Sequence, residues 1–163
     1  MARGMNRWSW WQKSLGSKSI RREVLLNLLR HRYVREKQHA MRYRQHAERM
    51  SYPQFRDALL SIAAEEELHA QWLSAKITEL GEKLPDVIPI HVPREQNSWF
   101  YLRTDLEEER RCCGELQDDL SAINDEFPET AALLNIIEND GKRHRAGIRD
   151  MLARSDPQSF VLS

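Results

Sequence analysis

The sequence has no long apolar run and only two cysteines, and both shortages exclude classes of protein. No stretch approaches the roughly 18 consecutive apolar residues of a membrane-spanning helix, and no apolar segment follows the basic N-terminus, so we expect neither an anchor nor a secretory signal. Cys112 and Cys113 are adjacent, so they are poorly placed for a disulfide and too few for a four-thiolate metal site. A reducing, cytoplasmic location is the expectation.

Glycine and proline are also scarce, with six of each among 163 residues, and they gather where helices would begin or end. Pro53 and Pro128 suit the first turn of a helix, where a missing N–H costs nothing. A segment that opens at Gly81 holds three prolines and cannot be regular helix, and Asn97 or Ser98 can cap the next helix. The pattern predicts four helices, at about 19–50, 53–80, 98–125 and 128–154.

These lengths predict an all-α protein, a four-helix bundle with one long crossover between helices two and three. That connectivity is the one found in ferritin-like bundles. We expect three regions: a basic, tryptophan-containing segment at 1–18, the bundle at 19–154 and a tail at 155–163.

Charge is balanced overall but not along the chain. Residues 1–50 contain 13 lysines and arginines against 3 glutamates, although the whole sequence has 25 basic and 25 acidic residues. The preferred interpretation is a basic helix beside an acidic one, so no nucleic-acid partner is expected. The alternative is a face that binds a polyanion.

Apolar residues in each predicted helix recur in steps of three and four, which places them on one face. The first series is Leu29, Tyr33, Glu36, Ala40, Tyr43, Ala47 and Met50. The third is Leu102, Leu106, Glu109, Cys113, Leu116, Leu120 and Ile123. A shift of 73 residues superimposes the first series on the third, and a shift of 75 superimposes the second on the fourth, which suggests two copies of one helical hairpin.

Polar residues interrupt every one of these apolar faces at its middle. They are Glu36, Glu66, His69, Glu109 and His144. Buried carboxylates cost several kcal/mol unless they are paired or bind a metal, and no Arg or Lys falls in these core registers. A Glu-x-x-His pair puts an oxygen and a nitrogen on one helix face, and two such pairs with two further glutamates form the dimetal site of ferritin-like proteins. We therefore predict a metal site, with iron, manganese or zinc as the candidate ions.

Gly141 departs from that template. Its register is that of Glu66 in the second hairpin, where the next Glu-x-x-His should begin, but glycine offers no ligand atom. Glu138, one turn earlier, is the substitute ligand we consider, with Asp140 a weaker one. The site is then an asymmetric two-metal site, a single-metal site or an empty polar core.

Two short patterns resemble the rubrerythrin branch of the ferritin-like superfamily. The first is Glu36 followed by Arg42-Tyr43 and Ala47, and the second is Glu66-x-x-His69-Ala70. The resemblance implies a diiron-carboxylate protein in which Glu36, Glu66 and His69 ligate one iron, while Glu109 and His144 serve the other. It also implies that Tyr43 hydrogen-bonds a ligand carboxylate.

The family resemblance implies a peroxidase or ferroxidase, since rubrerythrins reduce hydrogen peroxide and ferritins oxidise ferrous iron. Three departures separate this chain from rubrerythrins: Gly141, a cysteine at 112 in place of an extra glutamate, and no rubredoxin-type Cys-x-x-Cys module, so electrons would come from a separate donor. The alternatives are a non-catalytic binding or assembly module and a membrane-associated diiron hydroxylase, the latter suggested by Trp8, Trp10 and Trp11 among basic residues. A homodimer is expected.

Overall fold

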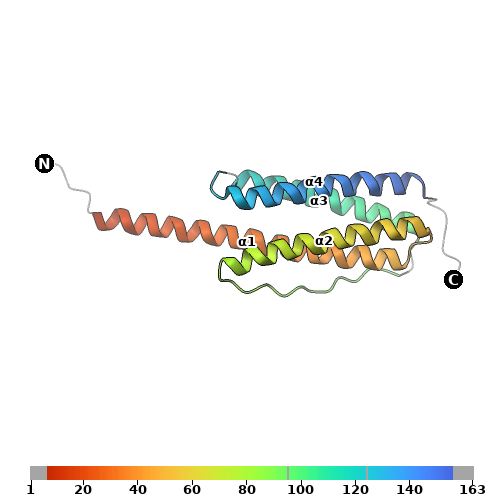
Figure 1. Cartoon of the computed structure of the whole chain (residues 1–163), viewed down its shortest axis with the longest axis horizontal. Coiled ribbons are helices and arrows are strands. Elements are labelled where there is room, and N and C mark those ends of the chain that lie inside the picture. Colours follow the sequence, from red (N-terminus) through yellow and green to blue (C-terminus); the bar gives the residue numbers. More distant parts are fainter. Residues whose placement is uncertain (1–6, 95, 124, 156–163) are drawn as a thin grey trace.

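The chain forms a bundle of four helices built from two antiparallel hairpins (Figure 1). The computed structural model describes residues 7–94, 96–123 and 125–155, and for residues 7–20 it describes the backbone alone. The helices are α1 (Arg7–Glu48), α2 (Pro53–Glu79), α3 (Ser98–Ile123) and α4 (Pro128–Ala153). α1 packs along α2 and α3 along α4, and the hairpins join through α1 with α3 and α2 with α4. The all-α, four-helix prediction is confirmed.

α1 begins at Arg7, so the predicted helix start at residue 19 is wrong. Its N-terminal part projects beyond the ends of the other three helices (Figure 1). The segment contains no proline, and its one glycine, Gly16, costs only about 1 kcal/mol of helix propensity, so nothing local stops the helix. The tryptophan-containing segment is thus helical from Arg7 onward, while residues 1–6 and 156–163 lie outside the described residues.

Local chemistry sets the other helix ends as the sequence predicts. Pro53 and Pro128 are the first residues of α2 and α4. The side chain of Asn97 caps α3, because its Oδ1 accepts a hydrogen bond from the Phe100 N–H at 2.8 Å. α2 ends at Glu79, and Gly81, two residues later, has a φ of 78° that is readily adopted only by glycine and lets the chain turn away.

The long connection between α2 and α3 lies along the outside of the α1–α2 hairpin (Figure 1). Two side chains of α1 and the residue that follows it donate to its carbonyl groups: Gln38 to Ile88 at 3.3 Å, Gln45 to Ile90 at 3.2 Å and Arg49 to Val92 at 2.9 Å. The side chain of Val92, in the connection itself, is buried. The crossover is therefore attached to α1 along its length.

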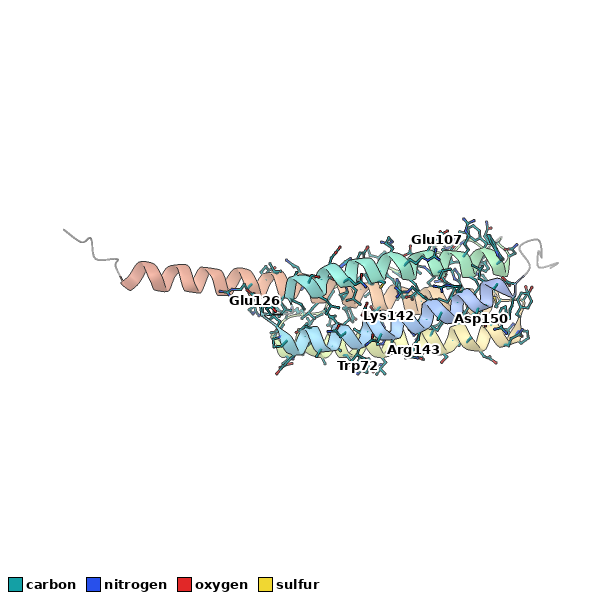
Figure 2. All side chains as sticks on the ribbon, turned by 90° about the horizontal axis from the view of Figure 1, so that it is seen from above. Trp72, Glu107, Glu126, Lys142, Arg143 and Asp150 are labelled. Carbon is teal, nitrogen blue, oxygen red and sulfur yellow. The ribbon has the colours of Figure 1, made fainter. Side chains whose placement is uncertain are left out.

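The apolar core has two parts. One surrounds Phe55, Leu102 and Ile148, and the other surrounds Leu29, Leu73 and Leu134. Charged side chains such as Lys142 and Arg143 cover the outside of α4 (Figure 2). None of the described helices is long and apolar enough to cross a bilayer.

Candidate metal centre

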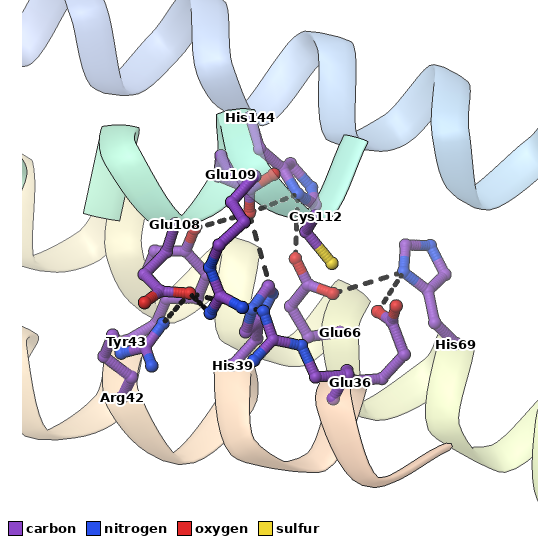
Figure 3. Close-up of polar contacts among 12 residues, drawn as sticks. Glu36, His39, Arg42, Tyr43, Glu66, His69, Glu108, Glu109, Cys112 and His144 are labelled. Atoms are coloured by element: carbon purple, nitrogen blue, oxygen red, sulfur yellow. Dashed lines mark hydrogen bonds and ion pairs between the residues drawn. The ribbon is translucent and has the colours of Figure 1, made fainter. Parts of the chain in front are cut away.

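A layer of polar side chains separates the two parts of the core. All five predicted ligands are there and none is more than 4% exposed: Glu36, Glu66, His69, Glu109 and His144. They come from all four helices and point toward one another (Figure 3). Helical periodicity explains the arrangement, since each residue occupies the inward register of its own helix at the same height in the bundle.

The first cluster joins α1 and α2. The Nδ1 atom of His69 lies 3.3 Å from Glu36 Oε2 and 3.4 Å from Glu66 Oε2. One donor atom from each of the three residues lies within 4.8 Å of the other two. These are two oxygens and one nitrogen, the donor types that iron, manganese and zinc accept.

Glu66 also faces a second cluster with its other oxygen. Glu66 Oε1 lies 3.0 Å from Nδ1 of His144, and that nitrogen lies 4.0 Å from Glu109 Oε1. The two oxygens of Glu66 thus face opposite sides of the centre. A carboxylate placed in this way is suited to bridge two ions.

Carboxylates behind the two histidines fix their orientation. Asp140 Oδ2 lies 3.0 Å from His69 Nε2, and Glu65 Oε2 lies 3.1 Å from His144 Nε2. The 75-residue shift relates the two pairs, because it carries Glu65 to Asp140 and His69 to His144. In each pair the outer nitrogen is engaged and Nδ1 faces the centre, the arrangement typical of metal-binding histidines.

Tyr43 is buried beside the centre. Its hydroxyl donates to Glu109 Oε1 at 2.6 Å, so it holds one of the predicted ligand carboxylates in place. This is the contact that the resemblance implies for Tyr43.

His39 also belongs to this layer, and sequence reasoning missed it. It is 3% exposed, and it forms a second group of donors with Glu66 and Glu109, each within 4.8 Å of the others. Its Nδ1 lies 4.0 Å from Glu109 Oε1, and its Nε2 is buried with no hydrogen-bond partner among the described residues. The available signal was spacing: His39 follows Glu36 by three residues, as His69 follows Glu66.

The carboxylates of the centre lack basic partners. Among the residues that the structure describes, no lysine or arginine forms an ion pair with Glu36, Glu66 or Glu109; the side chains within 4.0 Å that could pair with them are histidines. Burial and the charge of Glu66 raise the pKa of Glu36 well above its usual range and that of Glu109 to about 7. Burial also acts against ionised Glu66, but hydrogen bonds with Glu36, His144 and His69 hold its pKa well below the usual range.

The same contacts act on the histidines. Burial opposes protonation of His69, yet Glu36 and Glu66 outweigh it and raise its pKa to about 10. For His39, burial outweighs the charge of Glu66 and lowers the pKa to about 4. Without a bound cation, protons shared among buried carboxylates and imidazoles therefore balance the negative charge, and a metal would displace them.

Two pairs of polar side chains flank the centre, one on each side along the bundle. Arg32 Nε lies 2.5 Å from Asp119 Oδ2, and His46 Nδ1 lies 2.8 Å from Asp105 Oδ2. The 73-residue shift carries Arg32 to Asp105 and His46 to Asp119. The two pairs, each formed between α1 and α3, are therefore equivalent under the repeat that relates the hairpins. Arg32 is 1% exposed although it lies outside the predicted core registers, and Asp119 neutralises its charge.

The helix-three cysteines are arranged differently from the prediction. Cys112 is buried and Cys113 is only partly buried, so Cys112, not Cys113, occupies the core stripe. α3 turns the side chain of Cys112 toward Arg32, whose Nη1 lies 3.4 Å from its sulfur. Burial raises the pKa of the Cys112 thiol to about 12, which keeps it protonated.

Gly141 borders a cavity of about 20 Å³ at the edge of the centre, large enough for about one water molecule. A Cβ atom at this position would lie 3.5 Å from Glu109 Oε2, an ordinary contact. Glu138, the substitute ligand considered from the sequence, also lines the cavity, but its carboxylate binds Lys142 at 2.7 Å and Gln117 at 3.1 Å. Both oxygens of Glu138 are therefore engaged by other side chains, and Asp140 contacts the centre through His69.

Comparison with known proteins identifies the fold. No family model matches the sequence, and no curated protein matches it. The bacterioferritin of Desulfovibrio desulfuricans, described with a diiron site, superimposes with a TM-score of 0.73 over 82% of this chain and 81% of its own, at 20% identity. A ferritin-like diiron-carboxylate protein from Bacillus anthracis strain Ames gives 0.71 over 80% and 96%, at 21% identity. The chain has the fold of the ferritin-like superfamily.

Proposed function

We propose that this chain is a non-haem iron protein of the dimetal-carboxylate type, and that it reacts with peroxide or dioxygen or oxidises ferrous iron. The observation that carries the proposal is the cluster of three buried carboxylates without an arginine or lysine partner among the described residues. Such a cluster costs several kcal/mol unless cations or shared protons offset it. The diiron sites named for the two structural neighbours lie in the same fold, which is consistent with this assignment.

The donor set fits a metal, because imidazole nitrogens face carboxylate oxygens at 3.0–3.4 Å around Glu66. Neighbouring ligands of an ion with bonds of about 2.1 Å lie roughly 3.0–3.5 Å apart. Glu36, Glu66 and His69 would hold one ion, while Glu109 and His144 would serve the other. Iron bound there would supply one-electron chemistry toward dioxygen or peroxide.

The protein's own groups would orient the ligands and limit access. Asp140 and Glu65 hold the two histidines, and Tyr43 holds Glu109. Leu116 and Ile137 line the cavity beside them and restrict water. With space for about one water molecule, the cavity favours an oxidant the size of hydrogen peroxide or dioxygen over a lipid-like substrate.

One observation favours the alternative of a non-catalytic bundle. Gly141 leaves out a carboxylate that the dimetal template requires, and the nearby Glu138 is engaged with Lys142. In that alternative the fold is retained as a binding or assembly module. The membrane-associated hydroxylase rests on the N-terminal tryptophans, whose side chains lie outside the described part of the chain.

We also propose the homodimer, and α2 offers a surface for it. Leu60 and Leu68 are 43% and 42% exposed, Ala64 is exposed between them, and Trp72 continues the row on the outside of the bundle (Figure 2). Residues four apart lie on one helix face. Molar mass in solution, measured by light scattering, tests this assembly.

Iron loading tests the proposed function. Ferrous iron is added anaerobically to the metal-free protein, bound iron is counted by elemental analysis, and near-ultraviolet absorbance is followed as peroxide or dioxygen is added. We expect iron to bind and the absorbance to change. Glu66→Gln should abolish iron binding and the absorbance change. Glu67→Gln should retain them, because the Glu67 carboxylate pairs with Lys37 at 2.6 Å outside the buried cluster.

Wild-type protein that binds no iron would refute the proposal. Iron that binds without any response to either oxidant would favour the non-catalytic module. Equal iron in Glu66→Gln and Glu67→Gln would place the metal elsewhere.

A further inference from the structure

We propose that His39 is a ligand of the second metal and takes the coordination position left by the carboxylate that Gly141 cannot supply. The second metal is then held by His39, Glu66, Glu109 and His144. The inference rests on the proposed metal-binding function and deepens it, because it names a donor that the dimetal template does not contain.

The first observation is the spacing on α1. Glu36 and His39 form a Glu-x-x-His pair with the same inward face as Glu66 and His69 on the neighbouring helix α2. The template has such pairs on two helices. In this chain the second complete pair lies on α1, whereas α4, with Gly141, retains only His144.

The second observation is that His39 is buried without satisfying its ring nitrogens. Within the part of the chain that the structure describes, Nε2 has no hydrogen-bond partner, and Nδ1 faces Glu109 Oε1 at 4.0 Å, too far for a hydrogen bond. A buried imidazole normally finds partners. His46, two turns further along the same helix, does so, since its Nδ1 lies 2.8 Å from Asp105.

The third observation is convergence on Glu109. Nδ1 of His39 and Nδ1 of His144 both lie 4.0 Å from Glu109 Oε1, and His144 Nδ1 lies 3.0 Å from Glu66 Oε1. Figure 3 shows these side chains directed at one another from α1, α2, α3 and α4. An ion among them, with bonds of about 2.0–2.2 Å, needs the 4.0 Å separations to close by less than about 1 Å.

The position also matches the missing ligand. His39, Glu109 and Gly141 line one cavity, and a Cβ at Gly141 would lie 3.5 Å from Glu109 Oε2. A carboxylate at 141 and the imidazole of His39 would thus approach the same metal. The exchange of a carboxylate for a neutral imidazole leaves three carboxylates and three histidines, where the template has four and two, so the site carries one less negative charge.

The test counts ferrous iron bound anaerobically to four proteins. Wild type should bind about two ions per chain and His39→Leu about one, because one donor set of the dimetal centre is broken. His46→Gln, a matched control at a buried histidine of the same helix, should retain both. His39→Leu/Gly141→Glu should recover the second ion, since the added carboxylate replaces the lost donor.

Thermal unfolding of the metal-free proteins gives a second readout. His39→Leu should unfold at or above the wild-type temperature, because it removes an unsatisfied buried nitrogen, yet it should gain less stability than wild type from ferrous iron. A purely structural histidine would give the opposite result: a lower unfolding temperature and an unchanged metal count. If His39→Leu does not fold, His39→Met provides the same comparison, since a thioether is a poor ligand for ferrous iron.

The outcomes separate this inference from the proposed function. No iron in wild type refutes the proposed function. Two ions in both wild type and His39→Leu leave that function intact and overturn the role of His39. One ion in each shows that the second donor set is not a site, and also overturns it.

Discussion

Two substitutions at Gly141 are expected to change the stability of the metal-free protein in opposite directions. Gly141→Ala adds a Cβ that meets Glu109 Oε2 at 3.5 Å, an ordinary contact. Removing glycine from a helix interior is worth about 1 kcal/mol. We therefore expect Gly141→Ala to stabilise the metal-free protein by about 0.5–1 kcal/mol, or roughly 1–4 °C for a chain of this size.

Gly141→Glu adds a carboxylate beside Glu109 and Glu66. At a separation of about 5 Å and an effective dielectric constant of about 20, two carboxylates repel by roughly 3 kcal/mol. Protonation limits the cost, because raising a glutamate pKa from about 4.3 to above 7 requires roughly 3.7 kcal/mol. The metal-free variant should therefore lose about 2–4 kcal/mol relative to Gly141→Ala.

With a bound cation, Gly141→Glu should become more stable than Gly141→Ala, since the new carboxylate becomes a ligand. Thermal unfolding of wild type, Gly141→Ala and Gly141→Glu is measured without metal and with saturating ferrous iron under anaerobic conditions. Gly141→Glu should show the smallest stability without metal and the largest gain on iron addition. If Gly141→Ala destabilises the metal-free protein, the inference that residue 141 has room for a side chain is refuted. If Gly141→Glu gains no more stability from iron than wild type, the inference that a carboxylate at 141 reaches the metal is refuted.

Three further outcomes are expected from the contacts of the centre. Tyr43→Phe removes the donor to Glu109 and should destabilise the protein by about 1–2 kcal/mol in urea unfolding; an unchanged midpoint would show that the 2.6 Å contact contributes nothing. His46→Ala leaves Asp105 buried without its partner and should cost about 3–5 kcal/mol, whereas a loss below 1 kcal/mol in the same assay would contradict the buried pair. Since the pKa of His69 is raised to about 10 and that of Glu109 to about 7, metal must displace protons at neutral pH. The apparent affinity for zinc, measured by competition with a chelator, should therefore rise about tenfold or more per unit between pH 6 and 8, and a flat profile would exclude a protonated metal-free site.

The polar layer of the core shows what the spacing of residues along the sequence determines. Glu36, Glu66, His69, Glu109 and His144 all fall at inward registers, and all are buried together. An α-helix fixes which side chains share a face within a few residues, so this information is local. The helix starts at Pro53 and Pro128 and the cap at Asn97 were predictable for the same reason.

Other features depended on how the helices rotate against each other. Cys112 and Cys113 differ by about 100° around α3, and only packing decided that Cys112 faces inward. Arg32 enters the core because Asp119 on α3 neutralises it, a pairing between residues far apart in sequence. Glu138 is a carboxylate and thus a ligand by residue type, but Lys142 and Gln117 engage both of its oxygens.

The sequence by itself determined a four-helix bundle with a carboxylate and histidine layer and a gap at Gly141, because helix periodicity and helix ends follow from local backbone geometry. Only the tertiary structure decided that His39 joins the layer and that Glu66 directs one oxygen to each side. Those facts depend on distances between helices, which arise from the packing of two apolar clusters around the polar layer.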